Sequence, residues 1–190
     1  MANPSATRKR KPRKVTAKSL ERAALFYLER FATSAENLRR VLMRRVERSV
    51  HFHGTDREAG AGLVDGLVAR YLASGLLDDR AYAEGRVRTM RRRGSSARLI
   101  RLKLRQKGVA DDVVAGALAD HAEDGTDPEA AAAAALARRR RLGPFRPPAE
   151  RQEKREKDLA ALARAGFSYD MARRVIEAPS PEDLADDEFL

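Results

Sequence analysis

The sequence predicts an all-α protein built from three tandem three-helix repeats. Ala, Arg, Leu and Glu, which are good helix formers, dominate the 190 residues. Few segments show the alternation of β-branched and polar residues that marks a strand. Only 5% of the residues are aromatic and there is no Trp. We therefore expect several small cores of Leu, Val and Ala in place of one large core.

The first repeat is expected over residues 16–77, after a flexible basic arm at residues 1–15. The arm contains two prolines and few apolar residues, so it has little with which to pack. A first helix should run over about residues 17–31, because apolar residues recur there at helical spacing. The expected buried face consists of Leu20, Ala24, Leu28 and Phe31, with Leu25 beside it.

The second helix of this repeat has a clear start signal. Residues 33–36 (TSAE) have the form of a capping box, in which a hydroxyl accepts a backbone N–H and a Glu reaches back. The polar, glycine-containing segment 51–62 is interpreted as a break before a third helix at about 63–74. The inward-facing residues of the second helix should be Leu38, Val41, Leu42 and Val46.

The second repeat is expected over residues 78–123. Gly75 stands where a helix end needs a left-handed residue, and Asp78 or Asp79 can cap the helix that follows. Helices are predicted over about 80–93 and about 97–107, the second of them capped by Ser95 or Ser96. A shorter third helix should be capped by Asp111.

The first two repeats share a spacing. Ser34 precedes two apolar residues by four and eight positions, and Ser96 precedes Ile100 and Leu104 by the same intervals. This recurrence is the sign of an internal repeat.

The third repeat is expected over residues 124–178. Asp127-Pro128 is a strong helix start, with Asp at the cap and Pro in the first turn. An Ala-rich helix should follow to about residue 141, and two more are expected at about 149–165 and from Ser168 to Glu177. The acidic tail, residues 179–190, is predicted to be frayed.

Positive charge extends beyond the arm. Residues 1–18 carry seven basic side chains and no acid, and residues 177–190 carry six acids and no base. The remaining body has 32 basic and 22 acidic residues, so it contributes +10 of the net charge of +11. A basic field of this kind attracts polyanions such as nucleic acid, although it can also serve solubility alone.

Several classes of function lack support. Without cysteine there is no disulfide, thiolate nucleophile or Cys-ligated zinc. His51 and His53 have the spacing of some metal sites, but nearby acids are only Asp56 and Glu58, so no metal or other cofactor is expected. No phosphate-binding loop or nucleophile elbow is present, and we predict a protein that is not an enzyme. With no apolar span and no signal peptide, a cytoplasmic monomer is expected.

The junction between the first two repeats resembles the RecX family of regulatory proteins. Residues 75–83 (GLLDDRAYA) match the family signature G-x-[L/I]-[D/N]-D-x-x-[Y/F]-[A/V]. Residues 96–108 are similar to the family's second repeat, which ends in L-x-x-K-G, and residues 34–43 fit its first repeat. The resemblance covers about residues 17–178 and thins in the third repeat. The signature positions Gly75, Leu77, Asp78, Asp79 and Tyr82 are interpreted as structural, with Asp79 as a helix cap and Tyr82 packed between repeats.

Residues 86–107 contain ten basic side chains and no acidic one. Exposed helix faces usually mix signs, so like charges at this density favour an interaction surface over a merely solvated one. Arg98, Arg101 and Arg105 fall on one helical stripe, away from the apolar positions. The predicted partner-binding or DNA-binding residues are Arg86, Arg88, Arg91, Arg92, Arg93, Arg98, Arg101, Lys103, Arg105 and Lys107, with Arg39, Arg40, Arg44 and Arg45 as a secondary set.

The resemblance implies an elongated, curved array of the three repeats. It also implies a negative regulator of homologous recombination and the SOS response. Such a protein binds RecA and its single-stranded-DNA filament, and limits filament growth, ATP hydrolysis and strand exchange. Direct contact with DNA is left open, and the alternative is a stand-alone basic nucleic-acid-binding protein.

Overall fold

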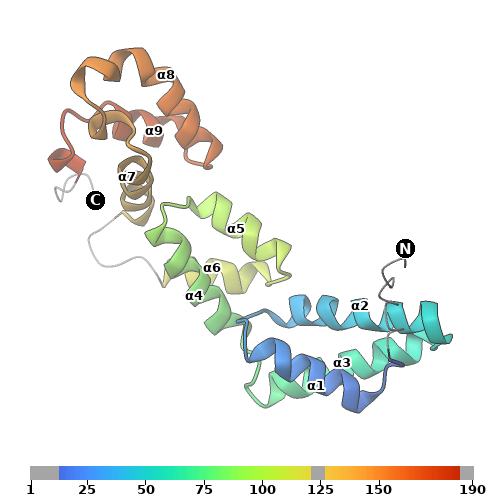
Figure 1. Cartoon of the computed structure of the whole chain (residues 1–190). Coiled ribbons are helices and arrows are strands. Elements are labelled where there is room, and N and C mark those ends of the chain that lie inside the picture. Colours follow the sequence, from blue (N-terminus) through green and yellow to red (C-terminus); the bar gives the residue numbers. More distant parts are fainter. Residues whose placement is uncertain (1–12, 121–126, 185–190) are drawn as a thin grey trace, which may run out of the picture. The chain divides into compact units, whose positions relative to one another are not determined.

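The computed structural model describes residues 13–120 and 127–184. Over these residues it contains nine α-helices, two short 3-10 helices and no strand (Figure 1). The prediction of an all-helical fold is therefore confirmed. The chain divides into two compact units, Met1–Asp78 and Asp79–Leu190.

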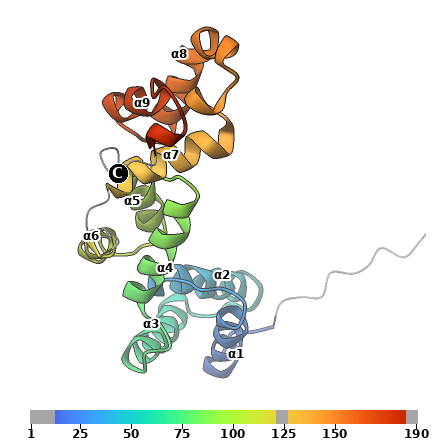
Figure 2. The ribbon, with the colours of Figure 1, turned by 90° about the vertical axis from the view of Figure 1, so that its left-hand side faces the viewer.

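The first unit contains three helices that surround one core. They are α1 (Ala17–Leu28), α2 (Ala35–His53) and α3 (Arg57–Ala73), and Figure 2 shows them packed side by side. Each begins at a residue whose side chain accepts a backbone N–H of the first turn, which satisfies a donor that the helix itself cannot pair. The core residues are Leu20, Ala24, Ala35, Leu38, Leu42, Val46, Val64, Leu67, Val68, Tyr71 and Leu77.

The predicted break at residues 51–62 is wrong. Helix α2 continues to His53, and only residues 54–56 separate it from α3. Asp56 starts α3 early, because its carboxylate accepts the N–H groups of Glu58 and Ala59 at 2.8 and 3.2 Å. Gly60 therefore lies inside α3, where an added Cβ would come within 2.5 Å of Val46 Cγ1. The glycine permits close packing of α2 and α3, and does not mark a loop.

Two further expectations for this unit need correction. The first helix ends at Leu28, and Phe31 is 54% exposed instead of buried. The end of the predicted arm belongs to the fold: Val15 packs against the core, and its N–H donates to Ser49 Oγ over 3.0 Å. Residues 1–12 of the arm lie outside the described residues.

The second unit begins with α4 (Asp79–Arg92), α5 (Ala97–Gln106) and α6 (Asp111–Ala119). Of the two serines predicted as candidate caps, Ser96 caps α5, and its hydroxyl accepts the N–H of Leu99 over 3.2 Å. Asp111 does not cap α6, because it is the first helical residue and its carboxylate pairs with Arg105. These helices enclose a core of Ala83, Val87, Met90, Ile100, Leu104, Val109, Val114, Ala117 and Leu118.

The same unit continues with α7 (Pro128–Arg140), α8 (Pro148–Arg164) and α9 (Tyr169–Ile176). Short 3-10 helices occupy Gly143–Phe145 and Glu182–Leu184. These helices have a separate core of Ala130, Ala132, Ala133, Leu136, Ala137, Leu142, Leu159, Ala161, Leu162, Phe167, Ala172, Val175, Ile176 and Leu184.

The start signals predicted for this part are confirmed, and the frayed tail is corrected in part. Asp127 and Ser168 cap α7 and α9. Leu184 is only 4% exposed, because its side chain completes the core of α7, α8 and α9. Residues 185–190 lie outside the described part.

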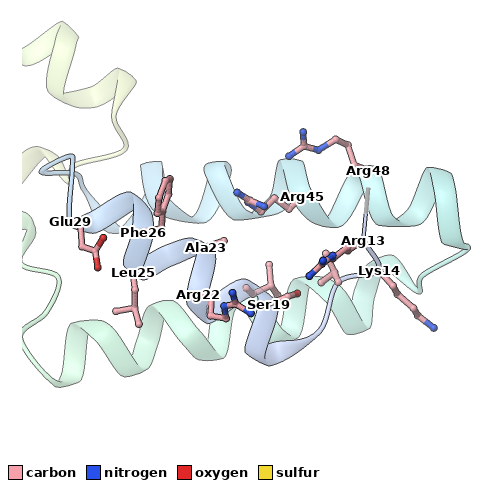
Figure 3. Close-up of a pocket in the computed structure, with 12 residues that line it drawn as sticks. Arg13, Lys14, Ser19, Arg22, Ala23, Leu25, Phe26, Glu29, Arg45 and Arg48 are labelled. Atoms are coloured by element: carbon pink, nitrogen blue, oxygen red, sulfur yellow. The ribbon is translucent and has the colours of Figure 1, made fainter. Parts of the chain in front are cut away.

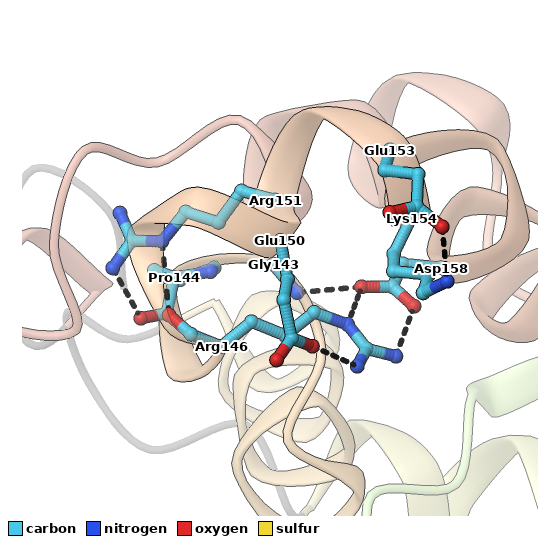
Figure 4. Close-up of polar contacts among 8 residues, drawn as sticks. All are labelled: Gly143, Pro144, Arg146, Glu150, Arg151, Glu153, Lys154 and Asp158. Carbon is cyan, nitrogen blue, oxygen red and sulfur yellow. Dashed lines mark hydrogen bonds and ion pairs between the residues drawn. The ribbon is translucent and has the colours of Figure 1, made fainter.

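A buried carboxylate organises the turn between α7 and α8 (Figure 4). Asp158, whose side chain is 1% exposed, accepts the N–H of Gly143 at 3.0 Å and two N–H groups of Arg146 at 2.7 and 2.8 Å. Arg151 donates to the backbone oxygens of Pro144 and Arg146. The carboxylate of Asp158 is therefore paired with a guanidinium and with a backbone N–H, as a buried charge requires.

Two of the contacts between the α4–α6 and α7–α9 parts of the second unit lie around the start of α5. The hydroxyl of Ser96 donates to the backbone oxygen of Ala165 over 2.7 Å. Gly94 approaches α7 so closely that an added Cβ would lie 2.5 Å from the backbone nitrogen of Leu136. The start of α5 is therefore held by both α7 and the end of α8.

Candidate partner-binding surface

The basic residues of α4 and α5 form the candidate surface in the second unit. The apolar residues Ile100 and Leu104 of α5 are 0% and 1% exposed, so this face of the helix packs on the core and the basic residues lie on its other faces. Nine of the ten predicted residues are exposed in the structure. We call them the α4–α5 basic surface: Arg86, Arg88, Arg92, Arg93, Arg98, Arg101, Lys103, Arg105 and Lys107.

Arg91 is the exception among the ten. Its side chain is 10% exposed, and Nη1 lies 2.6 Å from Oε2 of Glu129 on α7. The same carboxylate accepts the backbone N–H of Ala97 at 3.0 Å. Arg91 therefore joins two parts of the second unit, and its guanidinium is not presented to a partner.

The predicted stripe on α5 is present and lines a hollow. Arg98, Arg101 and Arg105 are exposed, and with Leu99 and Leu102 they form one wall. The other wall is the end of α8, residues 163–166, which contributes Arg164. The hollow has a volume of about 480 Å³. Sequence reasoning missed Arg164, because nothing local to α8 indicates that its end lies against α5.

Part of the stripe is already neutralised within the chain. Arg105 forms a two-point ion pair with Asp111, with N–O distances of 2.6 and 2.7 Å. The hydrogen bond from Arg105 lowers the pKa of Asp111, and the same bond raises the pKa of Arg105. Arg98 and Arg101 have no ion pair with any acid in the described part of the chain. They are therefore the cations of this wall most available to an anionic partner.

The secondary set lies on α2 in the first unit, and its four arginines differ in whether they form an ion pair. Arg39 pairs with Asp65 at 2.6 Å, and Arg40 pairs with Glu36 at 2.8 Å. The hydrogen bond with Asp65 raises the pKa of Arg39. Arg44 and Arg45 are exposed. The four residues thus divide into two that are ion-paired within the first unit and two that are exposed and form no ion pair in the described residues.

The signature residues have structural positions. Gly75 has a φ of +72°, the left-handed backbone conformation that often follows the end of an α-helix. Leu77 is buried in the core of α1, α2 and α3. Asp79 does not cap α4 as predicted, because it is the first helical residue and the position before the helix is that of Asp78. Tyr82 is partly buried against the core of α4, α5 and α6.

The described residues contain no cluster of three or more His, Asp or Glu that could hold a metal ion. His51 and His53 lie exposed in the last turn of α2. In the part of the chain that the structure covers, no helix combines the length and apolarity that crossing a bilayer needs.

Comparison with known proteins gives one consistent result. Residues 78–118 match the family model for the second three-helix domain of RecX. The chain is 48% identical over 170 residues to the regulatory protein RecX of Myxococcus xanthus, covering 89% of this chain and 90% of that protein. It is 30% identical over 160 residues to the regulatory protein RecX of Agrobacterium fabrum, covering 84% and 83% of the two chains.

A solved structure supports the fold. The crystal structure of a regulatory protein RecX superposes with a TM-score of 0.56 and 23% sequence identity, over 85% of this chain and 72% of the other. At this level of identity the match concerns the arrangement of the backbone, and it carries no information on individual site residues.

Proposed function

Because the chain belongs to the RecX family of regulatory proteins, we propose that it binds the RecA recombinase on single-stranded DNA and limits its activity. The activities concerned are filament growth, ATP hydrolysis and strand exchange. Through them the protein would act as a negative regulator of homologous recombination and the SOS response in the cytoplasm. The observation that carries the proposal is the α4–α5 basic surface, in which seven exposed cations lie on α4 and α5 and two more directly follow these helices.

The chemistry of this surface suits a polyanionic or acidic target. The planar guanidinium of arginine grips a phosphate or carboxylate with two parallel hydrogen bonds. Seven of the nine exposed cations are arginines. The hollow beside Arg98 and Arg101 also exposes Leu102, at 52%, so a partner can bury apolar area next to the charges. That combination is typical of protein interfaces in which arginine is enriched.

Two compact units in one chain favour binding to a repeating target. A RecA filament presents the same site on each subunit, so the two units could each make contacts of modest strength. Once one unit is bound, the second binds at a high effective concentration. Two contacts that are weak separately can therefore together give strong inhibition.

The test is RecA-catalysed ATP hydrolysis on single-stranded DNA with increasing amounts of this protein. We expect inhibition at or below an equimolar ratio to RecA. The double variant R98E/R101E should need roughly tenfold more protein, because two exposed charge contacts are reversed. The control is R139E/R140E, which reverses two exposed arginines at the end of α7, outside the α4–α5 basic surface. It should inhibit as the wild type does.

Absence of inhibition at equimolar or higher ratio would overturn the proposal. The alternative, a stand-alone nucleic-acid-binding protein, predicts tight binding to single-stranded DNA without RecA. That binding would weaken with salt by about 0.7 in the logarithmic slope for each phosphate neutralised. Fluorescence anisotropy with a labelled oligonucleotide, at several salt concentrations, separates the two cases.

A further inference from the structure

The first unit has a groove that lies outside the α4–α5 basic surface. It runs between α2 on one side and α1 with residues 13–15 on the other, and its volume is about 840 Å³ (Figure 3). This volume is within the range of sites that hold ligands. Of its lining residues, only Arg45 belongs to either predicted set.

Basic side chains dominate the charge of the groove. Five cations line it against a single acid, Glu29. Within the described residues none of the five has an ion-pair partner. Unpaired like charges at this density favour binding of an anion. The five cations are Arg13, Lys14, Arg22, Arg45 and Arg48.

The groove also exposes apolar side chains. Leu25 is 42% exposed and Phe26 is 51% exposed, and neither belongs to the core of the unit. The guanidinium of Arg30 lies 3.7 Å from the centroid of the Phe26 ring. Two large apolar residues next to cations offer a partner both a buried contact and a charge contact.

These features are separated along the groove. Figure 3 shows Phe26 and Glu29 towards one end of α1, while Arg13 and Lys14 lie beyond its other end. Arg45 and Arg48 project from α2. A ligand that fits this pattern has an apolar group at one end and several negative charges at the other.

We propose that this groove binds an acidic peptide segment of RecA. Its carboxylates pair with the arginines of α2 and of residues 13–15, and an apolar side chain rests on Leu25 and Phe26. The assignment of this peptide to RecA rests on the proposed function above. The recognition chemistry rests on the groove alone.

A single-stranded nucleic acid fits the groove less well. Such strands are bound by several aromatic side chains on which successive bases stack. Phe26 is the one aromatic residue lining this groove, and Arg30 already covers part of its ring. A strand also carries a phosphate at every nucleotide, which would place negative charge beside Glu29. A peptide can carry its carboxylates at one end only, so that none lies beside Glu29.

The test uses a fluorescein-labelled synthetic octapeptide, with six Asp and Glu residues followed by Phe-Leu, and measures anisotropy with the full chain. R45E should weaken binding by about fivefold or more, because one charge contact becomes a repulsion. K18E is the control, since Lys18 is an exposed cation on α1 that does not line the groove and belongs to neither predicted set. F26S should weaken binding of this peptide, but not that of a version with Ser-Ser in place of Phe-Leu.

Equal affinity of R45E and K18E would overturn the proposal, as would tighter binding of an unlabelled thymidine octanucleotide than of the peptide in competition. The outcome is separable from that of the proposed function, because the peptide assay contains no RecA. Peptide binding that depends on Arg45, without any effect on RecA ATP hydrolysis, would support the groove and reject RecA as the source. Inhibition of RecA together with failure of the peptide test would reject the groove alone.

Discussion

The guanidinium of Arg91 on α4 donates to the carboxylate of Glu129 on α7 over 2.6 Å, across 38 positions of sequence. The same carboxylate accepts the first N–H of α5 at Ala97. One acidic side chain therefore pairs a largely buried arginine and also satisfies a helix start. This relationship explains why Arg91 differs from the exposed arginines around it.

Glu129→Ala should destabilise the second unit by about 2 kcal/mol, because it leaves a mostly buried guanidinium and a backbone N–H without their acceptor. The measurement is urea unfolding followed by circular dichroism at 222 nm. The control is Glu47→Ala, which removes an exposed partner of Arg57 and should cost at most about 0.5 kcal/mol. Equal effects of the two variants would contradict the structural role of Glu129.

Gly94→Ala should destabilise the second unit by about 2 to 4 kcal/mol. The residue has a φ of +74°, and a Cβ would lie 2.5 Å from the backbone of α7. Gly85→Ala is the matched control, because Gly85 lies inside α4 with nothing within 4 Å of an added Cβ. Alanine there should stabilise by about 0.5 to 1 kcal/mol. Thermal unfolding of both variants distinguishes a glycine needed for packing from one that is replaceable.

Local signals in the sequence predicted local structure well. Asp127 and Ser168 each cap a helix as predicted, because a cap involves residues only two or three positions apart. At α2 the capping box predicted over residues 33–36 is displaced by one position, since Ser34 and not Thr33 is the cap. The apolar spacing of Leu38, Leu42 and Val46 likewise placed the buried face of α2.

Contacts between distant segments were not predictable in this way. The stretch 86–107 contains no acid, but Glu129 and Asp111 supply carboxylates to Arg91 and Arg105 from outside it. The sequence around Gly60 predicts a loop, because the close contact of Gly60 with Val46 exists only once α2 and α3 pack together. The first-unit groove was missed for the same reason, because residues 13–15, α1 and α2 each contribute only part of it.

Asp158 should make the stability of the second unit depend on acid pH. Burial raises the pKa of its carboxyl, but the hydrogen bonds from Arg146 and from the N–H of Gly143 outweigh burial and leave the pKa lowered. A group whose pKa is lower when folded stabilises the protein above its unfolded value, about 3.9. That stability is lost as the pH falls through the folded value.

Asp158→Asn should therefore cost about 3 kcal/mol at pH 7, because Arg146 loses its main partner in a largely buried turn. The difference from the wild type should shrink as the pH falls below about 4, where the aspartate itself takes up a proton. Urea unfolding at pH 7, 5, 4 and 3 measures this. A difference that stays constant over the series would show that the charge of Asp158 is not what stabilises the turn.

Asp111→Asn should strengthen the action of the α4–α5 basic surface on RecA. Asp111 holds Arg105 in a two-point ion pair, so its neutralisation frees a guanidinium on the wall that contains Arg98 and Arg101. If this wall meets an acidic protein surface or DNA, the concentration needed to inhibit RecA ATP hydrolysis should fall by roughly twofold to fivefold at low salt. The gain should decline as the ionic strength rises towards 0.5 M, since exposed charges are then screened. Asp112→Asn is the control, because it removes the same charge from the first turn of α6, and no ion pair of Asp112 with Arg105 is found in the described residues. An equal gain in both variants would mean that overall charge, and not the release of Arg105, governs the interaction.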